Sequence, residues 1–239
     1  MTDDVEKPPY EPHLGETRPY WRDIILGVND GLVSEFLLLT GVIGGGLTAD
    51  QVLLTVVAGA IAGAISMSTG EYLATKSQEE VLDREVALER EHIKWYREEE
   101  TEQLHGMLAG LGLHDDVLDA ATEQIAGDDE ALIASMKVLE FGVVDDDRRS
   151  PWLAAIYSGL LFIAGAMPSV LPFLFVEDVF VGLWWAAGLA GAALFGVGVA
   201  KTIATGTNPW VAGGENLAVS FLGGILSFGV GRLFGVNVA

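Results

Sequence analysis

The chain has 239 residues, half of them hydrophobic, and a mean hydropathy of +0.38, yet its formal net charge at pH 7 is −21. These values are compatible only if apolar and acidic residues are segregated along the chain, as in a membrane protein with an acidic soluble part. The absence of cysteine excludes disulfides and thiolate metal sites, and we expect no nucleic-acid partner for so acidic a chain.

Residues 1–22 are polar and rich in proline, which is typical of a tail and unlike a signal peptide. Two apolar stretches follow, at Asp23–Gly46 and Gln51–Thr75. Each is long enough to cross ~30 Å of hydrocarbon, which needs about 20 residues. Their short connection predicts antiparallel neighbours. In the second stretch, Gly59 and Gly63 are spaced for close contact between helices.

Residues 76–150 form an acidic insert, since 21 of the 34 acidic residues lie between Glu79 and Asp147. Good helix formers predict one helix from Glu79 to Leu108. "HDDVLDAATEQIAG" predicts a second helix, and "DDEALIASMKVLEFGV" a third that is N-capped by Asp128 or Asp129. An acidic excess of this kind is also favoured in a salt-rich cytoplasm, so we expect a halophilic source.

Three further spans are predicted at Trp152–Val176, Val179–Ile203 and Trp210–Val236. Pro168 and Pro172 should break the first of these, which membrane proteins tolerate where other groups satisfy the freed carbonyls. The predicted fold is therefore an all-α integral membrane protein with five transmembrane helices and a cytoplasmic three-helix metal-binding insert. Its parts are a tail at residues 1–22, membrane helices at 23–75 and 151–239, and the insert at 76–150.

The basic residues predict the orientation. With the amino terminus inside, 12 of the 13 Lys and Arg residues are cytoplasmic, and only Arg232 is not. The positive-inside rule then places the amino terminus and residues 76–150 in the cytoplasm and the carboxyl terminus outside. We expect a multi-pass protein of the cell membrane.

The first two spans carry acids without a basic partner. Asp30 lies within the first span, and Met67 and Glu71 share a helix face at i, i+4 in the second. Soft sulfur beside carboxylate oxygen suits a divalent first-row metal ion. Since no Lys or Arg lies in either span, a cation or a proton must supply the positive charge. The alternatives are hydrogen bonding of Asp30 in a helix interface, packing for Met67 and an interfacial place for Glu71.

The insert carries a stripe of potential ligands. Spacings of three and four predict one helix face for Glu85, Glu89, His92, Tyr96, Glu99 and Gln103, with Glu102 on the adjacent stripe. Met136 and Glu140 are also i, i+4. Acids that converge from facing helices make carboxylate metal sites. The alternative is a solvated acidic surface that binds nothing specifically.

Four motifs resemble the vacuolar iron transporter family: "RDIILGVNDGLVS", "GAISMSTGEYLATKSQ", "GAMPSVLPF" and "FGVGRLFG". The resemblance runs from about Arg22 to the carboxyl terminus. It implies a homodimer with five membrane helices and a cytoplasmic helical metal-binding domain. Such proteins move Fe(II), and often Mn(II), out of the cytosol in exchange for protons. The acidic composition suits a haloarchaeal member.

The resemblance also implies roles for particular residues. Asp30 and Met67 correspond to the translocation site. In the insert, the family's glutamate pairs fall on Glu89 and His92, and then either on Glu100 and Gln103 or on Glu99 and Glu102. Its last motif falls on Met136, Lys137 and Glu140. His92, Gln103 and Lys137 depart from the family pattern, a proline between the pairs is missing, and Glu35 has no counterpart there.

We therefore expect a transporter and no enzyme, which exports Fe(II), and also Mn(II) or Zn(II), by proton antiport through Asp30, Met67 and Glu71. No prosthetic group is expected; the partners are divalent ions, protons, the lipid bilayer and a second copy of the chain. One alternative is a ferroxidase-like enzyme, although a di-iron site would use two Glu-x-x-His motifs and only "EREH" is present. The other is a membrane-tethered metal sensor without transport.

Overall fold

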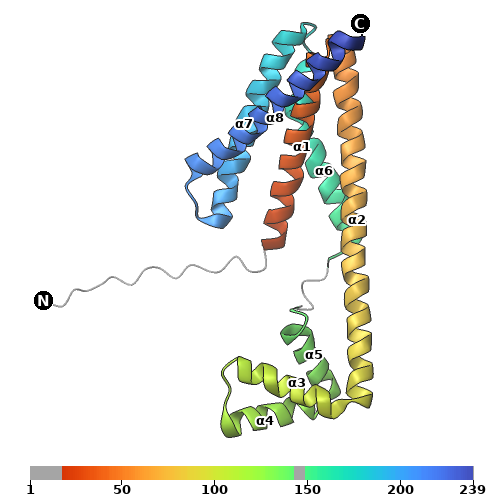
Figure 1. The fold of residues 1–239 in the computed structure, drawn as a ribbon, viewed down its shortest axis with the longest axis vertical. Helices are drawn as coiled ribbons and strands as arrows, with labels where there is room; N and C mark the ends of the chain where they lie inside the picture. Colours follow the sequence, from red (N-terminus) through yellow and green to blue (C-terminus); the bar gives the residue numbers. More distant parts are fainter. Residues whose placement is uncertain (1–17, 143–148, 239) are drawn as a thin grey trace, which may run out of the picture. The chain divides into compact units, whose positions relative to one another are not determined.

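The structure, a computed structural model, describes residues 18–142 and 149–238, and within them all regular secondary structure is helical (Figure 1). Most of the expected tail and the acids at 145–147 lie outside the described residues. The helices are α1 (Arg18–Gly44), α2 (Ala49–Trp95), α3 (Arg97–Gly110), α4 (Asp115–Ala126), α5 (Asp129–Leu139), α6 (Pro151–Val170), the 3-10 turn η3 (Leu171–Leu174), α7 (Val179–Thr205) and α8 (Pro209–Val238).

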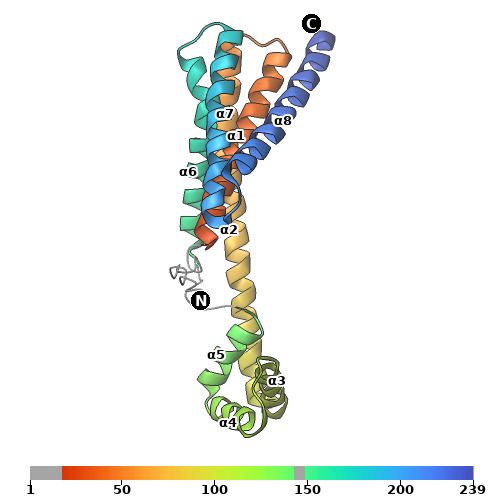
Figure 2. The same ribbon diagram turned by 90° about the vertical axis from the view of Figure 1, so that its left-hand side faces the viewer.

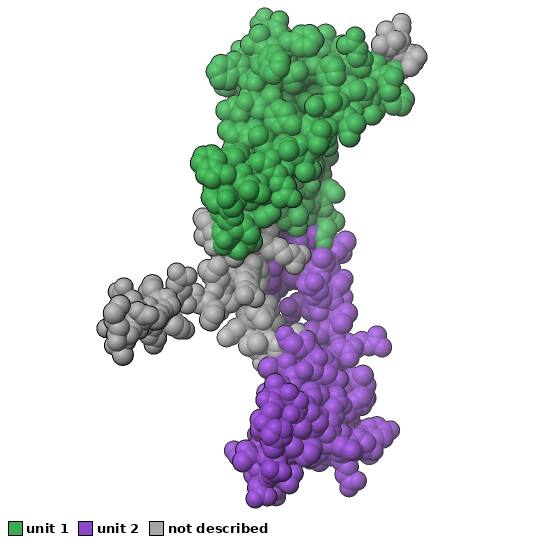
Figure 3. Space-filling view, turned by 60° about the vertical axis from the view of Figure 1, so that its left-hand side comes forward, with its two compact units in different colours: residues 1–70, 155–239 green, residues 71–154 purple. Residues whose placement is uncertain are grey.

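Five of these helices are long and apolar enough to cross a membrane: α1, α2, α6 with η3, α7 and α8. This confirms the predicted number of spans. The chain divides into two compact units, residues 1–70 with 155–239 and residues 71–154 (Figure 3). We call the first the membrane unit and the second the insert unit.

Within the membrane unit, α1, α7 and α8 pack against one another (Figure 2). A buried apolar cluster joins α1, α2, η3 and α7 through residues that include Leu39, Val56, Phe173 and Ala186. Burying apolar surface contributes little to helix association in lipid, so close packing must hold these helices together. The contacts therefore depend on small residues.

Glycines provide the close approaches. Gly31 of α1 faces the backbone carbonyl of Phe162 on α6, and Gly165 of α6 faces the carbonyl of Val28 on α1. Gly63 of α2 lies against the Phe162 ring. Two helices approach so closely only where no Cβ intervenes, and the spacing of Gly59 and Gly63 correctly indicated such a contact.

The prolines of the third span act as the sequence predicted only in part. Pro168 lies inside α6 without ending it. The α-helix stops at Val170, and Pro172 lies in the short 3-10 turn that follows. A residue before proline is disfavoured in the α conformation, which is consistent with a helix end just before Pro172, although α6 continues through Pro168.

The helix α2 extends far beyond its apolar part. Its 47 residues correspond to about 70 Å, more than twice the hydrocarbon thickness. Between Lys76 and Trp95, 10 of 20 residues are charged, so this part cannot lie in hydrocarbon. We therefore treat the residues after Thr75 as lying outside the membrane.

The prediction of one helix from Glu79 to Leu108 is wrong. The chain leaves helical geometry at Tyr96, with φ −131° and ψ 41°, and α3 begins at the next residue. Two forces favour this break. Three acids in the first turn of α3 suit a helix N-terminus. Folding back also brings Leu104 and Leu108 into one buried core with Ile93, Leu132 and Met136.

The remaining insert helices match their predictions closely. The second predicted helix corresponds to α4, and the third to α5, which is capped by the side chain of Asp128 accepting from the amide of Glu130. Figures 1 and 2 show α3, α4 and α5 gathered at the end of α2. The predicted three-helix insert is therefore three short helices packed on the end of a long one.

The glycine contacts lead to a prediction about stability. Gly31→Ala should destabilise the membrane unit by about 1–3 kcal/mol, because the new methyl group would meet the Phe162 carbonyl and the backbones must separate. Gly70→Ala is the matched control, since nothing lies within 4 Å of a Cβ there. The measurement is thermal unfolding in detergent, and equal midpoints for the two variants would contradict the prediction.

Candidate metal-binding sites

Three ligand side chains converge in the insert unit. Glu89 and His92 of α2 and Glu100 of α3 each place one ligand atom within 4.8 Å of the other two. The Nδ1 atom of His92 lies 3.1 Å from Oε1 of Glu100. Glu89 and Glu100 are only 4% and 6% exposed, and each has one carboxylate oxygen that is buried without a hydrogen-bond partner. We call Glu89, His92 and Glu100 the insert cluster.

The break at Tyr96 creates this cluster. His92 lies in the last turn of α2, three residues after Glu89 and on the same helix face. Glu100 lies in the first turn of α3. A helix C-terminus favours a cationic side chain and a helix N-terminus favours an anionic one, so both residues suit their places. One unbroken helix would carry Glu100 away from the other two.

The other predicted ligands lie in different surroundings. Glu99, Glu102 and Gln103 are exposed and do not join the cluster, and Glu85 is half-buried. The stripe predicted along a single helix face therefore does not exist. Of the two placements that the resemblance left open, the geometry gathers Glu100 and not Glu99 with Glu89 and His92.

Met136 of α5 and Glu140, the residue that follows this helix, lie near the insert cluster but differ in exposure. Met136 is fully buried in the insert core. Glu140 is exposed, yet its charge acts on Glu89. A thioether and a carboxylate would add soft and hard ligands to the cluster if α5 shifted slightly.

The electrostatics of the insert cluster favour a bound cation. The pKa of Glu89 is raised from 4.5 to about 7, mainly by burial and then by the charges of Glu100 and Glu140, while His92 opposes the shift. Buried carboxylates that repel one another hold a proton or a cation between them. Nitrogen and oxygen ligands of this kind suit a divalent first-row metal ion better than calcium or magnesium.

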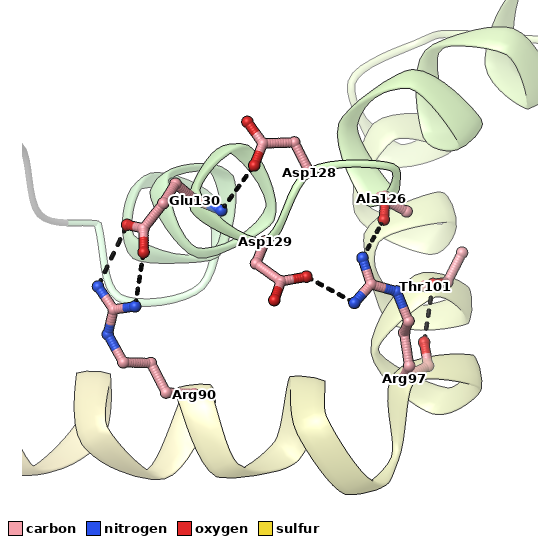
Figure 4. Close-up of polar contacts among 7 residues, drawn as sticks. All are labelled: Arg90, Arg97, Thr101, Ala126, Asp128, Asp129 and Glu130. Atoms are coloured by element: carbon pink, nitrogen blue, oxygen red, sulfur yellow. Dashed lines mark hydrogen bonds and ion pairs between the residues drawn. The ribbon is translucent and has the colours of Figure 1, made fainter.

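Two arginines fix α5 beside the cluster (Figure 4). Arg90, next to Glu89, binds both carboxylate oxygens of Glu130 at 2.7 and 3.2 Å. Arg97 binds Asp129 at 2.6 Å and the carbonyl of Ala126 at 2.5 Å. Bidentate arginine contacts restrict orientation as well as distance. They hold the start of α5 to the two helices that supply the ligands.

The residues expected to form the translocation site lie on α1 and α2. Asp30 is half-buried and accepts a hydrogen bond from the Ser34 hydroxyl at 3.1 Å. Met67 and Glu71 are half-buried and follow one another on a face of α2. Among the residues that the structure describes, no basic side chain forms an ion pair with Asp30.

Sequence reasoning missed a polar group on α8. The amide of Asn216 donates to Oδ1 of Asn29 at 2.9 Å and to the carbonyl of Leu194 at 2.8 Å. Both asparagines line a cavity of about 260 Å³, together with Glu215 and Lys201. Interhelical hydrogen bonding is therefore the role of Asn29, while its neighbour Asp30 has no such partner. The sequence signal that could have revealed this polar group is the pair "EN", Glu215 and Asn216, inside the last apolar stretch.

Comparison with known proteins gives consistent results. Residues 21–232 match the VIT family. The chain is 28% identical to vacuolar iron transporter 2 of Oryza sativa subsp. japonica over 211 residues, which cover 88% of this chain and 86% of that protein. It is 30% identical to vacuolar iron transporter 1 of Arabidopsis thaliana over 206 residues, covering 86% and 81%.

The geometry predicts which glutamate of the "EEE" run binds metal. Glu100→Gln should lower the affinity of the purified chain for Mn(II) at least tenfold, because it removes a buried ligand. Glu99→Gln removes the same charge from an exposed position and should change the affinity less than twofold. Electron paramagnetic resonance of free Mn(II) measures both. Equal losses would mean that the acidic surface attracts ions without a defined site.

The raised pKa of Glu89 predicts the pH dependence of metal binding. Because a ligand must lose its proton to bind, the affinity for Mn(II) should rise between pH 6 and pH 8. In the absence of metal, the raised pKa of Glu89 stabilises the folded state at low pH. This stabilisation is lost as the pH rises through 7. Glu89→Gln should flatten both profiles, whereas His92→Ala should leave a pH dependence due to Glu89. Profiles of Glu89→Gln identical to those of the unmodified chain would contradict this.

Proposed function

Since the chain belongs to the VIT family, we propose that it exports Fe(II), and also Mn(II), from the cytoplasm in exchange for protons. The chain is a multi-pass membrane protein of a metal transporter family, whose named relatives are vacuolar iron transporters. The identity of the ions, the direction of transport and the coupling to protons are our proposal. So are the homodimer and the cell membrane as its location.

The observation that supports this proposal most strongly is the environment of Asp30. It is half-buried in an apolar helix, and no basic residue pairs with it among the described residues. An acid in a membrane span costs at least a few kcal/mol unless a partner offsets its charge. A transported cation supplies that partner during transport, and a proton supplies it when the site is empty.

Met67 and Glu71 complete the proposed path. The thioether of Met67 selects a softer ion than calcium or magnesium, and the Glu71 carboxylate supplies a second charge one turn further along α2. Metal and protons compete for the same carboxylates, which links the two fluxes. While the ion is bound, these carboxylates take up cytoplasmic protons less readily. When the opposite side of the membrane supplies protons, they displace the ion and it leaves.

The insert cluster serves to capture metal in the cytoplasm. Its two buried carboxylates and one imidazole bind a divalent ion before it enters the membrane unit. Met136 and Glu140 extend the cluster, while the exposed Glu99 and Glu102 raise the local concentration of cations. With the amino terminus inside, the insert lies on the side from which metal is exported. No prosthetic group takes part in this sequence of events.

The test is uptake of Fe(II) and Mn(II) by liposomes that contain the purified chain, with and without a pH gradient. We expect metal entry that accelerates when the lumen is acidic. Asp30→Ala should insert normally and lose at least 90% of the flux, whereas Asp50→Ala, at the exposed start of α2, should retain it. Absence of flux in the unmodified chain would favour a sensor, and full flux in Asp30→Ala would make that acid structural.

A further inference from the structure

A second intramembrane acid, Glu35, lies near the middle of α1 and takes no part in the proposed path. It is 2% exposed, and its Oε2 atom is buried without a hydrogen-bond partner. Burial of an unpaired ionised carboxylate is among the most costly arrangements in a protein. Its presence in a helix otherwise packed through apolar residues and glycines therefore calls for a function.

The fold leaves space for this carboxyl group. A Cβ at Gly59 of α2 would lie 2.9 Å from Oε1 and 3.3 Å from Oε2 of Glu35. Any larger residue at position 59 would push the carboxyl group away, so glycine there forms the wall of a small compartment. Leu38, one turn along from Glu35, also contacts Gly59 and shields the carboxyl group from lipid and water.

A second buried polar atom without a partner lies on α6. Ser169 is fully buried, and its hydroxyl oxygen makes no hydrogen bond within the described structure. Gly31 contacts Phe162, and Gly165 contacts Val28 and Leu32. The helices α1 and α6 therefore lie side by side and run in the same direction. One helical turn beyond Gly165 brings Ser169 to the level of residues 32–36 of α1. Glu35 and Ser169 thus belong to the same layer of the bundle.

No charged group of the surrounding helices neutralises Glu35. On α1, Asp30 is five residues away, about 140° round the helix. The nearest titratable residues to Gly59 on α2 are Asp50 and Glu71, 9 and 12 residues distant. The only titratable side chain of α6 is Tyr157. The Lys and Arg residues of α7 and α8 are Lys201 and Arg232, both exposed, and α8 meets α1 through Phe36 and Leu37 instead.

The positive charge that neutralises the Glu35 carboxylate is a proton and not a metal ion. Zinc-like ions take about four ligands and harder divalent ions take about six. Among the described side chains of this layer, Ser169 offers an unbonded hydroxyl beside the carboxyl group, whereas the hydroxyl of Thr40 donates to the carbonyl of Leu37. Too few ligands remain for a cation, whereas a proton needs only one oxygen.

We propose that Glu35 carries a further proton of the exchange, in addition to the proton that competes with metal at Asp30. This proposal rests on the proposed function. In the packed bundle Glu35 is a neutral carboxylic acid, because burial of the ionised carboxylate without a partner would cost far more. When α2 moves away from α1, water reaches the carboxyl group and takes the proton. The ionised carboxylate returns to the closed compartment only when a positive charge accompanies it. Closure therefore takes place either with a proton on Glu35 or with the transported cation bound in the membrane unit, and alternation of the two exchanges a proton for metal.

The first experiment uses liposomes with a pH-sensitive dye inside and Mn(II) outside. The unmodified chain should move protons outward as metal enters. Glu35→Gln, which imitates the protonated acid, should retain downhill Mn(II) flux within about twofold but move fewer protons per metal ion and be accelerated less by a pH gradient. Glu35→Asp keeps a titratable group and should retain the coupling. Asp50→Asn is the control for loss of an acid elsewhere.

A second measurement does not depend on transport. The infrared C=O stretch of the protonated Glu35 carboxyl group should be present in the difference spectrum between the unmodified chain and Glu35→Gln, and this band should disappear at high pH. If no metal flux occurs but this band titrates, the proposed function fails while proton binding by Glu35 stands. If metal and protons exchange equally well in Glu35→Gln, or the band is absent or independent of pH, the role of Glu35 is overturned.

Discussion

A carboxylate in a low-dielectric environment needs a positive partner, and this constraint governs the molecule. Asp30 and Glu35 lie in an apolar helix, and Glu89 and Glu100 are buried in the insert core, yet no Lys or Arg pairs with any of these four among the described residues. Arg90 and Arg97 of the insert pair with exposed acids of α5 instead. Four carboxyl groups thus remain for protons and cations, which are the ions of the proposed exchange.

Close helix packing makes the membrane unit able to hold such groups. Glycines at positions 31, 59, 63 and 165 replace side-chain volume with backbone contact. Where a glycine faces a carbonyl, it brings two helices together; where Gly59 faces Glu35, it leaves room for a polar group. Packing of this kind is sensitive to single methyl groups and has few intermediate arrangements. It therefore suits a bundle that alternates between closed and open states.

The insert unit differs from the membrane unit because water surrounds it. There the cost of burying Glu89 and Glu100 is met by the helix ends that meet at Tyr96, by His92 and by the arginine contacts that hold α5 in place. The energy of the exposed ion pairs is small, but their geometry restrains the helices. We propose that this site, with two buried carboxylates and one imidazole, collects a cation and releases it when protons compete.

The sequence by itself determined the helical fold and the five spans, and it marked Asp30, Glu89 and His92 as candidate ligands. Hydrophobic length and short-range spacing carry that information, since they act within one helix. Only the tertiary structure decided that the helix breaks at Tyr96, that Glu100 and not Glu99 joins the insert cluster, that Asn216 bonds to Asn29 and that Glu35 faces Gly59. Each of these depends on which faces of separate helices meet, and that is set by core burial and close packing between residues far apart in the chain.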